Sequence, residues 1–159
     1  MRRMQRAALR AILLTCTAGL SPAVLPAQGV TRDPCSLLTK AEVAKLVSSD
    51  KVFRTPPEKN DLTGGSVSCS FEAGGSGRTI EVILGRWTSP KPLSIPPKAQ
   101  AVTGIGDGAY SQTDGHGAAV VAKVGSHYLR VGAQNDDETG EKLRDLVTAA
   151  AKIIAPKLK

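Results

Sequence analysis

The sequence has no apolar run long enough to cross a lipid bilayer, and it is poor in histidine and aromatic residues. Its longest uncharged apolar stretch, residues 11–20, has ten residues, whereas a membrane-spanning helix needs about 20. Two histidines, one tryptophan, two tyrosines and two phenylalanines leave little material for a multi-histidine metal site or an aromatic platform for nucleic acid. G-x-S-x-G, H-E-x-x-H and EF-hand motifs are also missing. We therefore expect no transmembrane segment in the mature protein, no metal and no cofactor.

The first 27 residues have the layout of an export signal. Four arginines form a basic start, residues 11–20 form an apolar run, and residues 21–27 are mostly small residues and prolines that can hold a peptidase site. We expect a signal peptide over residues 1–27 and one exported domain over residues 28–159, located outside the cell or in the periplasm. Cleavage after Ala23 is the alternative. Lipid attachment at Cys16 is less favoured, because threonine precedes the cysteine where a small residue is preferred.

Removing the four arginines changes the charge balance. The full sequence has 21 basic and 14 acidic residues and a formal net charge of +7. Residues 28–159 keep 17 basic and 14 acidic residues, so the net charge falls to about +3, which is ordinary for a small domain. The basic residues are scattered, without a run of three, and we therefore expect no nucleic-acid partner.

Export leaves two cysteines, Cys35 and Cys69, in a compartment where thiols oxidise. One disulfide is then the only possible pairing within the chain. A metal-binding or reactive pair is the alternative, but 33 residues separate the two cysteines and no CxxC motif or histidine cluster accompanies them. We expect a structural disulfide.

The residues after Cys35 predict a helix. Thr39 and Glu42 match the T-x-x-E capping box, and Leu38 and Val43 stand at the positions of a hydrophobic staple. The apolar side chains that follow have helical spacing, and the helix is expected to end near residues 48–50.

Alternation of polar and apolar residues predicts strands in several segments. Residues 66–72 and 79–87 form an expected hairpin around a glycine-rich turn, and residues 109–112, 118–124 and 127–133 form three further strands. Residues 52–54 can add a short sixth strand. The proline-rich segment 88–100 is expected to be a stiff loop, and residues 143–154 repeat apolar side chains at helical spacing. The predicted fold is α+β: one antiparallel sheet of five to six strands, packed by an N-terminal and a C-terminal helix, with one disulfide.

Three segments carry a resemblance to a known family. Residues 33–43 spell D-P-C-S-L-L-T-K-A-E-V, Cys69 follows in a predicted strand, and residues 104–110 spell G-I-G-D-G-A-Y. This order resembles a family of small secreted bacterial domains of unknown function, many of them actinobacterial lipoproteins. The resemblance implies an envelope location and an α+β fold, and it implies no reaction. The chain departs from the family at the lipid-attachment site and in the proline-rich segment, where relatives often carry a helix.

Isolated polar residues offer little catalytic chemistry. Gly104, Gly106 and Gly108 form G-x-G-x-G, but the motif leads into a predicted strand, so we interpret it as a turn that Asp107 closes. His116 and His127 have no metal-site spacing, and His127 shares a strand face with apolar residues. The acids of residues 136–138 are expected to cap the final helix rather than to bind a cation.

One group of residues indicates a possible binding surface. Trp87, Tyr128 and Arg130 are expected on the sheet face opposite the apolar side chains, and residues of these types are favoured at recognition sites. The alternative is that the final helix or the proline-rich loop covers this face.

The sequence therefore favours a noncatalytic exported envelope protein that binds an unknown envelope protein or a small apolar ligand. The alternative is a secreted enzyme or enzyme inhibitor whose site is built from Asp107, His116 and His127.

Overall fold

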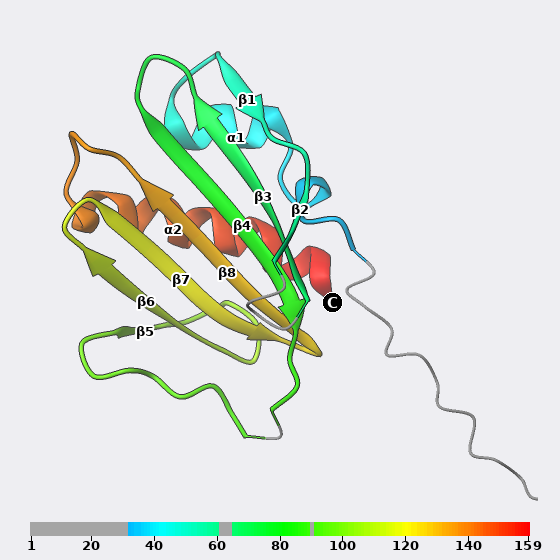
Figure 1. The fold of residues 1–159 in the computed structure, drawn as a ribbon. Helices are drawn as coiled ribbons and strands as arrows, with labels where there is room; N and C mark the ends of the chain where they lie inside the picture. Colours follow the sequence, from blue (N-terminus) through cyan, green and yellow to red (C-terminus); the bar gives the residue numbers. More distant parts are fainter. Residues whose placement is uncertain (1–31, 61–64, 90) are drawn as a thin grey trace, which may run out of the picture.

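A computed structural model of the chain describes residues 32–60, 65–89 and 91–159. The predicted signal peptide, both candidate cleavage sites and Cys16 lie outside the described residues. The described residues form an antiparallel sheet with two α-helices on one of its faces (Figure 1). No helix among them has the length and apolar character needed to cross a bilayer.

The sheet contains eight strands and follows the order β1-β3-β4-β8-β7-β6-β5, with β2 also paired to β3. Every pair of neighbouring strands is antiparallel. The strands are β1 (Val52–Arg54), β2 (Glu58–Asn60), β3 (Ser66–Ala73), β4 (Arg78–Arg86), β5 (Gln100–Val102), β6 (Gly108–Asp114), β7 (Gly117–Val124) and β8 (His127–Gln134).

The predicted number of strands was wrong: five to six were expected, and the sheet has eight. β2 and β5 are the additions, and each has only three residues. Three residues are too few to display the alternation that identifies a strand in a sequence. Both strands lie at the margin of the sheet, where pairing with one neighbour defines them. The α+β class, the two helices and the longer strands are confirmed.

Local residues determine where α1 (Lys40–Val47) begins and ends. The predicted capping box is present: the Glu42 amide donates to Thr39 Oγ1 at 3.1 Å, and the Thr39 amide donates to Glu42 Oε2 at 2.7 Å. The helix ends at Ser48, whose φ of 53° is left-handed, a conformation that closes many helices. A 3-10 turn, Pro34–Ser36, precedes α1.

The second helix, α2 (Gly140–Ile154), begins later than predicted. Residues 136–138 precede it and do not cap it, because the Glu138 carboxylate is bound by Arg78 on β4 at 2.6 and 2.7 Å. Gly140 sits where a Cβ would collide with the carbonyl oxygen of Gly117, so the helix starts close against β7. A 3-10 turn, Ala155–Leu158, follows α2.

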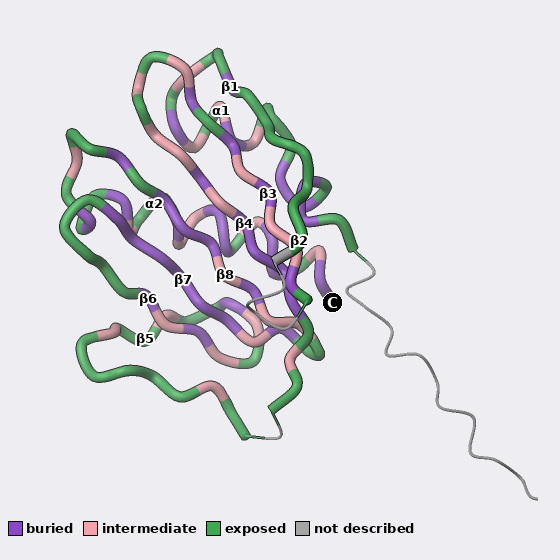
Figure 2. Tube along the Cα trace, in the orientation of Figure 1, coloured by how far each residue is buried: buried purple, intermediate pink, exposed green. Residues whose placement is uncertain are grey.

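The core lies between the sheet and the two helices. Cys35 and Cys69 form the predicted disulfide with a Cα–Cα distance of 5.2 Å, and both residues are at most 2% exposed. The bond joins the turn before α1 to the inner face of β3. Figure 2 shows that burial is most continuous along β7 and that β1, β5 and the segment before β5 are largely exposed.

Candidate functional site

The two helices cover one face of the sheet, and no helix of residues 32–60, 65–89 or 91–159 covers the other face. α1 contacts β1, β3 and α2, and α2 contacts β6, β7 and β8, which places both on the same side (Figure 1). We call the opposite side the open face. It carries the side chains of alternate strand residues, which on the two central strands are residues 117, 119, 121 and 123 of β7 and residues 128, 130, 132 and 134 of β8.

A row of cross-strand neighbours on the open face has small residues at its centre and polar residues at its ends. In strand order it consists of Ser70, Glu81, Gly132, Ala119 and Gln112. Side chains stand roughly perpendicular to a sheet, so a glycine and an alanine between longer neighbours leave a depression. The sheet therefore contains a hollow over β7 and β8. The Arg130 guanidinium lies over Gly132, with its Nη1 3.3 Å from where a Cβ would be, so the Arg130 side chain forms part of the floor.

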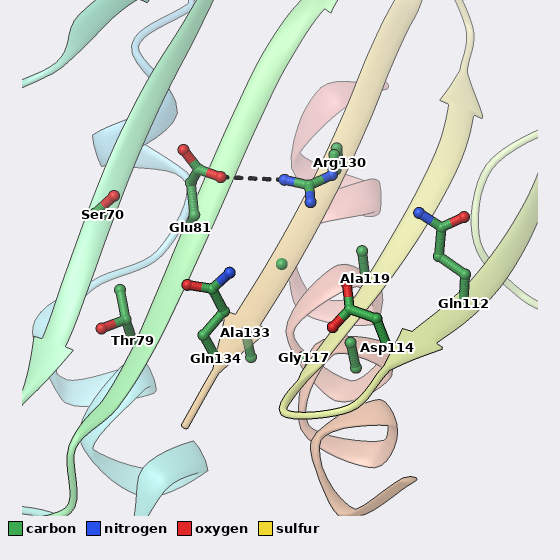
Figure 3. Close-up of a pocket in the computed structure, with 12 residues that line it drawn as sticks. Ser70, Thr79, Glu81, Gln112, Asp114, Gly117, Ala119, Arg130, Ala133 and Gln134 are labelled. Carbon is green, nitrogen blue, oxygen red and sulfur yellow. Dashed lines mark hydrogen bonds and ion pairs between the residues drawn. The ribbon is translucent and has the colours of Figure 1, made fainter. Parts of the chain in front are cut away.

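This depression, which we call the central hollow, has a volume of about 240 Å³. Figure 3 shows Glu81 on one side, Gln112 on the opposite side, and Ala119 and the Asp114 carboxylate between them. Its lining consists of Ser70, Thr79, Glu81, Gln112, Asp114, Gly117, Ala118, Ala119, Arg130, Gly132, Ala133 and Gln134. Hydroxyl, amide and charged groups thus surround a floor of glycine and alanine.

One ion pair crosses the edge of the hollow. Arg130 Nη1 donates to Glu81 Oε2 at 3.1 Å, and the two side chains are 35% and 38% exposed. A pair this exposed contributes at most about 1 kcal/mol to folding. The other N–H groups of Arg130 make no hydrogen bond with any described residue. The guanidinium therefore has donors that remain available beside the hollow.

The remaining polar side chains of the hollow are also unused within the described part of the chain. The side chains of Ser70, Thr79, Gln112, Asp114 and Gln134 form no hydrogen bond or ion pair with a described residue. Several polar groups that are free of internal partners and converge on one concavity are typical of a ligand site.

Only one of the three residues of the predicted binding surface lines the central hollow. Arg130 lines the hollow, whereas Tyr128 and Trp87 do not. Tyr128 lies on the open face beside Gly85, and its burial raises the pKa of its phenol. Trp87 follows the end of β4, where its amide donates to the carbonyl oxygen of Ser126 at 2.8 Å.

The structure does not bring the three isolated polar candidates together. Asp107 Oδ2 accepts from Lys123 Nζ at 3.2 Å and from the Gly125 amide at 3.0 Å, and these contacts lower the pKa of the Asp107 carboxyl. Asp107 therefore helps to hold the turn between β7 and β8, next to His127. His116 belongs to the turn at the other end of β7. No described group of three histidine, cysteine or acidic side chains is placed to hold a metal ion.

Most residues that line the hollow were not identified as candidate site residues from the sequence. The alternation of β4 placed Glu81 opposite the apolar side chains, and that polar position was an available sign. The small residues Gly132 and Ala119 gave no comparable sign, because the hollow forms only where β4 pairs with β8 and places Glu81 beside Gly132.

Comparisons with protein-family models, curated proteins and solved structures gave no match for the chain.

Proposed function

We propose that the chain is an exported, noncatalytic binding module that holds a small polar ligand in the central hollow. The observation that carries this proposal is the convergence of five polar side chains without internal partners on a floor of small residues. Gln112, Asp114 and Gln134 are exposed to solvent, so a polar ligand would replace the water that hydrates them in the free chain.

The expected apolar ligand fits this site poorly. Glu81, Arg130 and Asp114 carry charge at the hollow, and an apolar molecule would remove water from these groups without replacing its hydrogen bonds. The ligand we propose is therefore polar, which changes the expectation drawn from the sequence.

Export is supported by three features of the chain. They are the layout of residues 1–27, the Cys35–Cys69 disulfide and the resemblance to secreted bacterial domains. Disulfides persist mainly in oxidising compartments.

An enzymatic role has less support. Asp107 is held by Lys123 and Gly125, and His116 lies at the far end of β7 from Asp107 and His127. A nucleophile, a base and an oxyanion donor within reach of one another are the minimum for the chemistry considered.

An NMR screen that resolves single amides tests the proposal. The probes are separate pools of neutral sugars, amino acids, dicarboxylates, polyamines and medium-chain fatty acids. We expect a polar pool to shift the amides of Gly132 and Ala119, and the fatty acids to leave them unchanged. An absence of such shifts with every pool, or shifts with the fatty acids alone, would contradict the proposal.

The variant Ala119→Leu fills the hollow from its floor. Ala119 points away from the helices and is 4% exposed, so the larger side chain enters the hollow and displaces the side chains that cover Ala119. Ala101→Leu is the matched control, since Ala101 lies on the same face but is exposed on β5 outside the hollow. Binding should be lost in the first variant and kept in the second.

A further inference from the structure

The central hollow has a net negative charge. Its lining contains two carboxylates, Glu81 and Asp114, and one cationic side chain, Arg130. Arg130 Nη1 donates to Glu81 Oε2 at 3.1 Å, so these two charges largely offset each other. Asp114 has no hydrogen bond or ion pair with any described residue, so its charge is not balanced within the hollow. A ligand with one positive charge would balance it.

A glycine allows the Asp114 carboxylate to lie over the sheet. Asp114 pairs with Gly117 across the hairpin of β6 and β7, and its Oδ1 lies 2.5 Å from the position that a Cβ on Gly117 would take. Any larger residue at position 117 would therefore push the carboxylate aside. In Figure 3 the carboxylate lies between Glu81 and Gln112, so this negative group is inside the hollow and not at its outer edge.

A second acceptor lies beside the same glycine. Gln134 of β8 is the cross-strand partner of Gly117, and side chains at such positions have Cβ atoms about 5 Å apart. A primary ammonium group has three N–H donors and no acceptor. Over Gly117 it can donate to the Asp114 carboxylate and to the amide oxygen of Gln134, while its third donor faces solvent.

The Arg130 guanidinium lies at a distance from Asp114 that leaves room for a ligand between them. It covers Gly132, whereas the Asp114 carboxylate covers Gly117. The two glycines are diagonal neighbours on β8 and β7, and such positions are about 7 to 8 Å apart. The free N–H donors of Arg130 favour an uncharged acceptor at the other end of the ligand, because a carboxylate there would approach Glu81.

From these features we infer that the central hollow binds a small, singly charged primary amine with the Asp114 carboxylate as its counter-ion. The inference rests on the proposed function and specifies its ligand class. The ammonium group donates to Asp114 and Gln134, and a neutral oxygen of the same ligand accepts from Arg130. Asp114 and Gln134 are exposed, so solvent and salt screen the attraction, and we expect millimolar affinity.

The test is an NMR titration of the oxidised mature chain with straight-chain molecules that carry one polar group at each end of a four-carbon chain. Aminobutanol has a single positive charge, butanediol is neutral, hydroxybutyrate is an anion and aminobutyrate is a zwitterion. We expect aminobutanol to shift the amides of Gly117 and Gln134 in a saturable manner and with the highest affinity. Residues 28–159 have a net charge of about +3, so general attraction of cations to the protein would not explain such binding.

Asp114→Asn removes the charge and keeps the size of the side chain. Loss of the counter-ion predicts an aminobutanol affinity lower by at least about tenfold. The matched control is Asp145→Asn, which removes the same charge from an exposed residue of α2, on the other face of the sheet. Neither carboxylate has a described partner, so both variants should fold, and the control should bind aminobutanol like the parent chain.

A second variant moves the carboxylate without changing any charge. The Cβ added by Gly117→Ala would displace the Asp114 side chain, which is exposed and can turn toward solvent. We therefore expect this variant also to bind aminobutanol more weakly than the parent chain.

The other outcomes separate the two proposals. Saturable shifts with another probe or screening pool, but none with aminobutanol, would overturn the amine inference and leave the binding module in place. A higher affinity for butanediol, hydroxybutyrate or aminobutyrate than for aminobutanol would do the same. An absence of shifts with these probes and with all the screening pools would overturn both proposals. Equal aminobutanol affinities of the parent chain and Asp114→Asn would overturn the assigned counter-ion and with it the inference.

Discussion

Arg78 joins three separate parts of the fold through one guanidinium group. Its Nε and Nη2 donate to the two oxygens of Glu138 at 2.7 and 2.6 Å, and its Nη1 donates to the carbonyl oxygen of Val47 at 3.0 Å. The side chains of Arg78 and Glu138 are 26% and 18% exposed. The group thus ties β4 to the end of α1 and to the segment before α2, and paired bonds of this kind are among the stronger ones in proteins.

We predict that Arg78→Ala lowers the free energy of unfolding by about 2 to 3 kcal/mol, since it removes three charge-assisted bonds and leaves Glu138 partly buried without its partner. Urea unfolding followed by circular dichroism measures the change. Arg86→Ala is the matched control, because Arg86 ends the same strand, is exposed and has no hydrogen bond to a described residue. Equal effects of the two substitutions would contradict the assigned role.

The same contacts predict how stability depends on pH. The hydrogen bond from Arg78 lowers the pKa of Glu138, and the Thr39 amide together with Lys157 lowers the pKa of Glu42, in each case from an ordinary value of 4.5. A carboxyl whose pKa is lower in the folded state stabilises the fold above its unfolded pKa, and that contribution is lost as pH falls through the folded pKa.

We therefore expect stability to be level above about pH 5 and to fall at more acidic pH. Urea midpoints measured from pH 7 to pH 3 test this expectation. Glu138→Gln should be less stable at neutral pH and should lose less on acidification. A variant whose acid dependence equals that of the parent chain would show that Glu138 does not contribute.

At the scale of elements, the N-terminal end of α1 is held by two segments distant in the sequence. The disulfide attaches the turn before it to β3, and Lys157 near the C-terminus donates to Glu42 and to the carbonyl oxygen of Leu37 at 2.9 Å. A helix of eight residues is too short to be stable by itself in water. Its attachment to the sheet therefore depends on these tertiary contacts as well as on Val43 and Val47 in the core.

Removing the disulfide should destabilise the protein by about 3 to 4 kcal/mol, the value that loop closure predicts for cysteines separated by 34 residues. The comparison is between the parent chain and Cys35→Ala, Cys69→Ala, each unfolded in urea. Reductant should shift the parent toward the double variant and leave the variant itself unchanged. A thiol assay that finds two free cysteines in the native protein would contradict the bond.

The sequence predicted the elements whose determinants are local. The capping box of α1 lies within four residues, and the long strands show their alternation directly. The start of α2 was misplaced because Glu138 is bound by a residue 60 positions away, which no local pattern reveals. The hollow escaped prediction for a related reason: the turn at residues 125–126 sets Ala119 of β7 opposite Gly132 of β8, but the hollow also needs Glu81 of β4 opposite Gly132, and no local pattern specifies the pairing of β4 with β8.

At the scale of the whole molecule, both helices of the described residues lie on one face of the sheet. The segment 91–99 is mostly exposed and leads from the end of β4 to β5 at the margin of the sheet (Figure 2). The final helix lies on the opposite face, against β6, β7 and β8. The arrangement keeps the central hollow accessible, as a binding module requires.

Export is tested on the protein recovered from its native compartment. Intact-mass spectrometry should show a chain that begins at Gln28 and is two hydrogens lighter than the reduced form, because residues 1–27 are removed and the disulfide has formed. A chain that still begins at Met1 would contradict export. A mass increase that corresponds to a lipid on Cys16 would show that the protein is anchored to a membrane and is not released.

The hollow and the core share the strands β7 and β8 but use alternate residues of them. Val120 and Val131 are fully buried behind the floor that Ala119 and Gly132 make in front. Substitutions at exposed outward positions such as Gln112 and Gln134 can therefore change the lining of the hollow while the inward side chains of the core stay the same.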